Sequence, residues 1–325
     1  MPEALLSVRG LATHFVTRGG TLRAVDGVDL DLATGEVLGL VGESGCGKTV
    51  LALSLMRLVE APGKIVAGRI AFEGEDVMAM DARGLARLRG VGMGMIFQQP
   101  RTSLDPLIRV GRQIAEPLVQ HAGMTRSAAE REAVALLEAV GIPAPASRAR
   151  SYPHELSGGQ AQRVMIAIAL ALKPRLLIAD EPTTSLDVTV QAQILALLRE
   201  RCRALGTALI LVTHDIGVVA QLADRVAVMY AGRVVEQARV GALFAAPAHP
   251  YTQGLLQSAP VLGHRRQRLR AIEGGIPDLS RPIPGCAFAP RCEARASVGP
   301  RCEAEAPVPL PVAASHSARC WRLAP

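Results

Sequence analysis

The amino-acid sequence predicts an α/β fold that is interrupted by a block of helices and followed by a small extension. A short apolar strand, GEVLGLVG, runs directly into the glycine-rich stretch GESGCGKT at 42–49, and a helical pattern follows it. Three further helical patterns lie between about residues 100 and 175, and apolar strands then return in PRLLIADEP and TALILVTH. Alternation of buried strands and helices is typical of a sheet that is covered by helices.

The order of the patterns divides the chain into three parts. LLSVRGLATHFV, LRAVDGVDLDL and GKIVAGRIAFEGEDV alternate strand and turn signals, so we expect an N-terminal antiparallel β piece. VGRQIAEPLVQHAG, SAAEREAVALLEAVGI and QAQRVMIAIALAL have helical period, whereas RVAVMYAGRVVE is typical of a hairpin with an Ala-Gly turn. After about residue 245 the composition shifts to Pro, Gly, Arg and Cys with little periodicity. The predicted domains are a core at 1–97 and 166–245, an inserted helical subdomain at 98–165 and an extension at 246–325.

Composition and charge limit the classes of function. The chain has 325 residues, a formal net charge of +7 and only 3% aromatic residues, so its core must be aliphatic. No apolar run approaches the roughly 20 residues of a membrane span, and MPEALLSVRG lacks a secretory signal pattern, so we expect a cytosolic chain. The positive net charge is compatible with binding to nucleic acid, to an anionic membrane surface or to a nucleotide. The longest basic run, HRRQRLR at 264–270, is interpreted as a solvated linker.

The stretch GESGCGKT matches a phosphate-binding loop. Its glycines let successive N–H groups curl around phosphate oxygens, and it lies between a strand and a helix as that mechanism requires. Lys48 is expected to reach the β and γ phosphates, and the Thr49 hydroxyl to ligate Mg²⁺. Cys46 occupies a variable position of the loop and is interpreted as a small residue that fits there.

Carboxylates and polar side chains follow the later strands. Asp180, at the tip of LLIADEP, is placed to hold Mg²⁺ through water, and Glu181 to polarise the water that attacks a γ-phosphate. His214 ends another strand, at the edge of an open α/β sheet where ligands bind. Gln98 follows the strand pattern of MIFQQP and is favoured over Gln99 to reach Mg²⁺ and the attacking water.

A second anion-binding pattern lies more than a hundred residues after the phosphate-binding loop. ELSGGQAQRV at 155–164 has a polar residue and two glycines at a helix start, where free backbone N–H groups and the helix dipole attract an anion. The loop at 42–49 already provides a phosphate-binding site, so a single chain does not explain why a second anion-binding site is present.

The chain resembles an ATP-binding cassette ATPase in the order and spacing of its motifs. These are the phosphate-binding loop, FQQP, LSGGQ, ADEP, SLD and the histidine of VTH. The resemblance implies a RecA-like P-loop NTPase core over residues 1 to about 245. It also implies a head-to-tail dimer in which the signature LSGGQ of one chain closes on ATP held by the other. Phe15 is the expected adenine-stacking residue, with His14 as the weaker alternative. The implied ATP-binding residues are Phe15, Gly42, Ser44, Gly45, Cys46, Gly47, Lys48, Thr49, Val50, Ser157, Gly158, Gly159, Gln160 and Asp187. The implied catalytic residues are Glu181, His214 and Gln98, and the implied Mg²⁺ ligands are Thr49, Gln98 and Asp180.

A finer resemblance covers nearly the whole chain. The chain is similar to the ATPases of oligopeptide, dipeptide and nickel importers in five stretches. They are YPHELSGGQ, LLIADEPTTSLDVTVQAQI, VMYAGRVVE, HPYTQGLL and PGCAFAPRC. Gln160 stands where this subunit type often has Met. The likeness implies a sister ATPase as heterodimer partner, two membrane permeases, a substrate-binding protein, and a place on the cytoplasmic face of the inner membrane. No nucleic-acid partner is expected.

Two other functions compete with this interpretation. The net charge suggests a soluble cassette ATPase that acts on nucleic acid or ribosomes, but such proteins usually carry a second cassette or a coiled-coil insertion, and neither is visible here. A metal-cluster sensor that uses ATP only as a ligand is disfavoured by Glu181 and His214. Within the importer interpretation, a nickel chelate or another small solute is the alternative cargo.

Four cysteines lie within the last forty residues, in the pattern C-x5-C-x9-C-x17-C. Cytosolic thiols stay reduced, so the group favours a metal site over disulfides. The importer resemblance implies a 4Fe-4S cluster, for which four thiolates are the right number, with Zn²⁺ as the alternative. Because the segment shows little core, we expect a structural role for the site. The implied ligands are Cys286, Cys292, Cys302 and Cys320.

Overall fold

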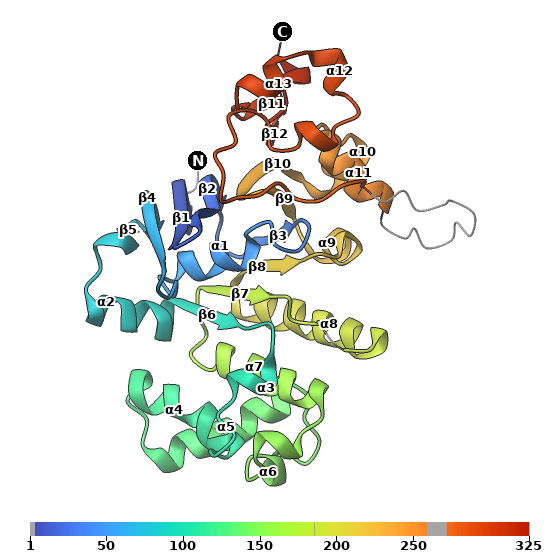
Figure 1. Cartoon of the computed structure of the whole chain (residues 1–325). Coiled ribbons are helices and arrows are strands. Elements are labelled where there is room, and N and C mark those ends of the chain that lie inside the picture. Colours follow the sequence, from blue (N-terminus) through green and yellow to red (C-terminus); the bar gives the residue numbers. More distant parts are fainter. Residues whose placement is uncertain (1–3, 185, 259–271, 325) are drawn as a thin grey trace. The chain divides into compact units, whose positions relative to one another are not determined.

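A computed structural model describes residues 4–184, 186–258 and 272–324. The basic run at 264–270 lies outside the described residues. The chain forms two compact units (Figure 1). One contains residues 1–33, 37–78 and 211–325, and the other contains residues 34–36 and 79–210. The predicted domain boundaries at residues 97, 165 and 245 stay predictions.

The first unit begins with the predicted antiparallel β piece. Its strands lie in the order β2-β1-β4-β5, with β1 paired to both β2 and β4. Leu6 and Val8 of β1 are fully buried because alternate residues face one side of the sheet, and Leu11 is buried after a register shift between Val8 and Leu11. The strands are β1 (Leu6–Thr17), β2 (Gly20–Leu32), β4 (Gly63–Phe72) and β5 (Glu75–Asp76).

A second sheet in the same unit carries the start of the phosphate-binding loop. Strand β3 (Val37–Val41) runs parallel to β9 (Arg225–Tyr230), and β9 forms an antiparallel hairpin with β10 (Arg233–Arg239). The turn between them is the predicted Ala-Gly pair, with φ of 48° at Ala231 and 80° at Gly232. Positive φ at both central residues is what a tight hairpin turn requires, so this prediction is confirmed.

The second unit holds the other two core strands and the block of helices. Strands β6 (Met93–Ile96) and β7 (Leu176–Asp180) are parallel neighbours and fully buried, as expected for strands covered on both faces. Figure 1 shows α4, α5, α6 and α7 grouped together. The helices are α2 (Ala82–Arg87), α3 (Pro100–Ser103), α4 (Val110–Ala122), α5 (Arg126–Ala139), α6 (Pro145–Arg148), α7 (Gly158–Leu170) and α8 (Val188–Leu205). The three long helical patterns of the sequence are therefore confirmed as α4, α5 and α7.

Three further short elements complete the core. Helix α1 (Lys48–Leu55) follows the phosphate-binding loop and packs on β1 and β2. Strand β8 (Ala208–Thr213) begins in the second unit and ends in the first. Helix α9 (Ile216–Leu222) then packs on β3. No helix in the described part of the chain is long and apolar enough to cross a membrane.

The C-terminal extension is more regular than its sequence predicts. Strand β12 (His316–Ala318) pairs with β10, and β11 (Leu310–Ala313) pairs with β12, so the tail adds two strands to the sheet of the first unit. Trp321 and Cys302 pack together in a small apolar cluster. The expectation of a segment with little core is therefore wrong, because such short elements leave no visible period in the sequence. Its helices are α10 (Val240–Ala245), α11 (Pro250–Ser258), α12 (Arg295–Val298) and α13 (Arg301–Ala304).

Candidate functional site

The phosphate-binding loop, residues 42–49, leaves β3 and enters α1 in the first unit. Gly47 is the N-cap of α1 with φ of 104°, a conformation that strains any residue with a side chain. A Cβ at Gly47 would also collide with the carbonyl oxygen of Ala24, and one at Gly42 with that of Met229. These glycines are therefore needed for the backbone path of the loop, and Ser44, Gly45 and Thr49 remain exposed on it.

Lys48 is the first residue of α1 and is only 5% exposed. Its Nζ donates to the carbonyl oxygens of Gly42 at 2.8 Å and Glu43 at 3.0 Å. The ammonium group is therefore held by the carbonyl oxygens of the loop itself. Cys46 is fully buried, with its sulfur 3.8 Å from Nζ, and burial raises the pKa of its thiol. A buried, protonated thiol fits the interpretation of Cys46 as a packing residue.

The second unit brings Gln98 and Glu181 together. Asp180 ends β7 and is 2% exposed, and Glu181 follows it with φ of 46°. Gln98 Nε2 donates to Glu181 Oε2 at 2.8 Å, and Thr184 Oγ1 donates to the same oxygen at 2.8 Å. Gln99 instead precedes α3, where its carbonyl accepts from the hydroxyls of the next turn. The carboxylate of Glu181 is thus oriented by two neutral donors.

The stretch LSGGQ forms the start of α7 through a capping box. Ser157 Oγ accepts from the Gln160 N–H at 3.3 Å, and Gln160 Oε1 accepts from the Ser157 N–H at 3.2 Å. This arrangement satisfies the backbone amides of Ser157 and Gln160. Within the described residues, the N–H groups of Gly158 and Gly159 have no hydrogen-bond acceptor. These two amides are available to an anion at the positive end of a 13-residue helix.

Three further predicted residues lie at element ends or on a strand edge. Asp187 is the N-cap of α8, where its Oδ1 accepts from the Val190 N–H at 3.0 Å. His214 directly follows β8 and is exposed. Phe15 lies in β1 opposite Leu22 and Gly63, with its ring partly exposed. Asp187 and His214 belong to different compact units.

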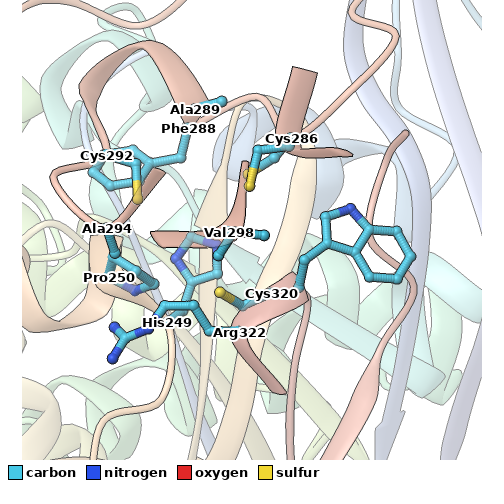
Figure 2. Close-up of a pocket in the computed structure, with 12 residues that line it drawn as sticks. His249, Pro250, Cys286, Phe288, Ala289, Cys292, Ala294, Val298, Cys320 and Arg322 are labelled. Carbon is cyan, nitrogen blue, oxygen red and sulfur yellow. The ribbon is translucent and has the colours of Figure 1, made fainter. Parts of the chain in front are cut away.

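The four C-terminal cysteines line one pocket together with His249 (Figure 2). All four cysteines are free thiols. Figure 2 shows the sulfur atoms of Cys286, Cys292 and Cys320 at the edge of this pocket. Burial, reinforced by the neighbouring thiols, raises the pKa of Cys286 to about 11. Burial also raises the pKa of Cys302 and Cys320. Among the described residues, no group of three or more His, Cys, Asp or Glu side chains is arranged to hold a metal ion.

Sequence reasoning missed three residues that touch the predicted site. Thr184 bonds Glu181, and its position in EPTTSLD was the available signal. Tyr251 and Arg291, in HPYTQGLL and PGCAFAPRC, contact Glu43 of the phosphate-binding loop from the C-terminal extension. Nothing in the spacing of these residues predicts a contact over more than 200 positions.

Two protein-family models match the chain. A model described as ABC transporter matches residues 25–184. A model described as oligopeptide/dipeptide transporter, C-terminal region, matches residues 235–298. The two matches cover the phosphate-binding loop, the LSGGQ group, the β7 carboxylates and most of the extension.

Curated relatives resemble the chain along nearly its whole length. A probable peptide ABC transporter ATP-binding protein of Sinorhizobium fredii is 48% identical, over 98% of this chain and 95% of the relative. The dipeptide transport ATP-binding protein DppD of Bacillus subtilis is 47% identical, over 98% and 95%. The oligopeptide transport ATP-binding protein AppD of the same organism is 49% identical, over 89% of each chain.

Solved structures share the fold of the larger part of the chain. A dimeric ATP-binding cassette bound to ADP and phosphate in a post-hydrolysis state has a TM-score of 0.65 at 26% identity. The match covers 72% of this chain and 98% of the cassette. A second structure, cbiO1 from Clostridium perfringens, is part of an ABC transporter complex. It has a TM-score of 0.64 at 30% identity and covers 75% of this chain and 92% of its own.

Proposed function

The chain belongs to the family of ATP-binding subunits of ABC transporters, and we propose that it hydrolyses ATP to drive the import of di- and oligopeptides through membrane permeases. The relatives named for peptide transport support this cargo class, because they match the extension as well as the cassette. A nickel chelate or another small solute is the alternative cargo. The motifs of the cassette concern the nucleotide and do not identify the solute.

Glu181 is proposed as the general base that polarises the attacking water. The observation that carries this assignment is the carboxylate oxygen at the end of β7 that accepts from both Gln98 and Thr184 at 2.8 Å. An oriented carboxylate within hydrogen-bond reach of a water is what general-base catalysis requires. His214 is proposed to act on the same γ-phosphate.

Mg²⁺ and the phosphates are assigned to the ends of two strands. The Thr49 hydroxyl, Asp180 and Gln98 are oxygen donors of the type that Mg²⁺ prefers, and we assign them as its ligands, Asp180 through water. Lys48, now bonded to loop carbonyls, would exchange these for phosphate oxygens. Loop amides from Gly45 to Val50 would hold the α and β phosphates, and Phe15 would stack on adenine.

The LSGGQ group is proposed to serve ATP bound to a partner chain. Its capping box leaves the Gly158 and Gly159 amides directed outward, and one chain already has a phosphate cradle. In a head-to-tail dimer, the LSGGQ group of each chain would contact the ATP held by the phosphate-binding loop of the other chain. Asp187, as the N-cap of α8, would help to form this interface. ATP then supplies the differential contact between open and closed dimers that a population shift requires.

The four-cysteine pocket is proposed to hold a 4Fe-4S cluster, with Zn²⁺ as the alternative. Four free thiols around one space are a donor set that suits soft metal centres. Cys286, Cys292, Cys302 and Cys320 would hold the cluster, although the described residues show no group of three or more His, Cys, Asp or Glu side chains placed to hold a metal ion. Bound there, the cluster would cross-link four points of the extension, a structural role.

A sister ATPase, two permeases and a substrate-binding protein are the proposed partners, with the chain on the cytoplasmic membrane face. The test is reconstitution of the transporter in vesicles with this chain and uptake of a radiolabelled dipeptide. Uptake that requires ATP and is lost in Lys48→Ala supports the proposal. ATP hydrolysis without uptake of dipeptide, oligopeptide or nickel chelate would remove the importer assignment.

A further inference from the structure

Glu43, the second residue of the phosphate-binding loop, makes contacts through each of its polar groups. Its carbonyl oxygen accepts from Lys48 Nζ at 3.0 Å. Its backbone N–H donates to Tyr251 Oη at 2.8 Å, and its carboxylate accepts two bonds from Arg291 at 2.8 and 3.0 Å. Two of these partners belong to the C-terminal extension, so the extension touches the loop that is proposed to bind ATP.

We propose that Tyr251 and Arg291 are positioning residues that hold the phosphate-binding loop in its binding conformation through Glu43. The inference rests on the proposed binding of ATP at this loop. It adds a role for the C-terminal extension in the ATP reaction: the extension sets the geometry of the nucleotide site without touching the nucleotide.

The side chain of Arg291 is buried and held by several hydrogen bonds. Its side chain is 6% exposed, against 28% for Glu43. Besides the two bonds to Glu43, its guanidinium donates to the carbonyls of Glu273 at 2.8 Å and Ile272 at 3.0 Å, and to Tyr230 Oη at 3.3 Å. A forked, bidentate pair of this kind defines the direction of both partners. The carboxylate of Glu43 is consequently held in one orientation.

Tyr251 supplies the second point of attachment. It is fully buried at the start of α11, and its ring packs on Tyr230 and Phe288 with centroids 4.6 and 5.5 Å away. The phenol oxygen therefore has little freedom to move, and it receives the Glu43 N–H. Tyr251 holds the backbone N–H of Glu43, and Arg291 holds its carboxylate. A change in the backbone or side-chain conformation of Glu43 would therefore break at least one of these contacts.

Fixing Glu43 fixes the carbonyl that holds Lys48. A loop that is already ordered loses less conformational entropy when a ligand binds, and this raises affinity. Removal of the attachments should therefore weaken nucleotide binding while the chemical step, carried by other residues, continues. A rise in KM with unchanged kcat is the kinetic signature of such a loss.

The test compares two substitutions with two matched controls in the purified full-length chain, using a fluorescent ATP analogue. Tyr251→Phe removes only the hydroxyl and keeps the ring packing, and Arg291→Ala removes the bidentate pair. Thr252→Val deletes the neighbouring buried hydroxyl, which has no hydrogen-bond partner among the described residues. Arg281→Ala removes an exposed arginine whose side chain pairs with Asp278 three positions earlier.

We expect the Kd of the analogue to rise about fivefold in Tyr251→Phe and about tenfold in Arg291→Ala, the latter about 1.4 kcal/mol. The controls should stay within about twofold, a difference below 0.5 kcal/mol or so. Turnover at saturating ATP should fall by less than about twofold in Tyr251→Phe, since uniform binding alone is lost. Thermal unfolding of Tyr251→Phe and Thr252→Val identifies any loss of fold.

A double-mutant cycle with Glu43→Gln decides whether Arg291 acts through Glu43. If it does, the two substitutions are not additive, and Arg291→Ala adds little to Glu43→Gln. Unchanged Kd in both Tyr251→Phe and Arg291→Ala, or full additivity with Glu43→Gln, overturns the inference. A wild-type chain that fails to bind the analogue would instead overturn the proposed ATP site.

Discussion

The side-chain amide of Gln98 donates a 2.8 Å hydrogen bond to a carboxylate oxygen of Glu181, 83 positions further along the chain. Thr184 donates to the same oxygen. The two bonds hold the carboxylate of Glu181 at the end of β7. This arrangement supports roles for both residues in activating a water, and those roles lead to separate predictions.

Glu181→Gln should retain ATP binding and lose turnover. The amide keeps the size of the side chain but cannot accept a proton, and general-base catalysis contributes about 10²–10⁴-fold to a rate. We expect phosphate release to fall by at least about 100-fold. ATP should then hold the chain in a closed dimer that elutes early in size-exclusion chromatography. Normal phosphate release by this variant would refute the assignment of the base.

Gln98→Ala should lower turnover more than Gln99→Ala does. Gln98 contacts Glu181, whereas Gln99 uses its carbonyl to begin α3. Loss of one neutral hydrogen bond costs about 1 kcal/mol, so a reduction in kcat of roughly five- to tenfold is expected for Gln98→Ala. The matched Gln99→Ala chain should stay close to wild type in the same assay. Equal effects of the two substitutions would contradict the choice of Gln98.

Stability should fall as pH drops below about 6.5, the ordinary pKa of an unfolded histidine. Burial lowers the pKa of His249 to about 4, although the nearby Glu236 carboxylate opposes this shift. Between these values the unfolded chain binds one proton more than the folded chain. The free energy of unfolding then falls by at most about 1.4 kcal/mol per pH unit.

The pH effect is measured as urea unfolding of wild type and His249→Asn at pH 7.5 and 5. The asparagine oxygen replaces Nδ1, which accepts from the Tyr251 N–H at 3.0 Å. Glu236 accepts from the His249 N–H and pairs with His316 in both proteins, so this hydrogen-bond network is common to the two chains that are compared. The variant should lose less stability on acidification. An equal loss in both proteins would assign the pH dependence to other groups.

Cys302→Ser should reduce the metal content of chain purified without oxygen. Cys302 is buried in the extension and lines the four-cysteine pocket. Cys202→Ala is the matched control, because Cys202 is equally a buried free thiol but lies in α8. Iron with visible absorbance supports the cluster, and zinc without absorbance supports the alternative. Wild-type chain with neither metal would exclude both.

Much of the core was predictable because its signals are local. A buried strand, a glycine-rich loop and a helix follow one another within about twenty residues, and periodicity alone identified β3, α1 and the helical block. The cassette fold that the motifs implied is confirmed by the structural matches. The start of α7 was also predictable, since a polar residue and two glycines stand directly before a run of helical period.

The contacts of the C-terminal extension were not predictable in this way. Tyr251 and Arg291 meet Glu43 across 208 and 248 positions, and their partners depend on the packing of α11 and the tail. Strand β12 has three residues, too few for an alternating pattern to be visible. Tertiary packing, which a linear pattern does not encode, decided these features.

The central claim is that ATP is cleaved only when Ser157, Gly158 and Gly159 of one chain close on the phosphates held by another. The most direct test measures phosphate release per chain over a dilution series, with the oligomeric state measured at every concentration. Turnover per chain should fall towards zero as the dimer dissociates and should return when chain or sister subunit is added. Full turnover by a chain shown to be monomeric would contradict the claim.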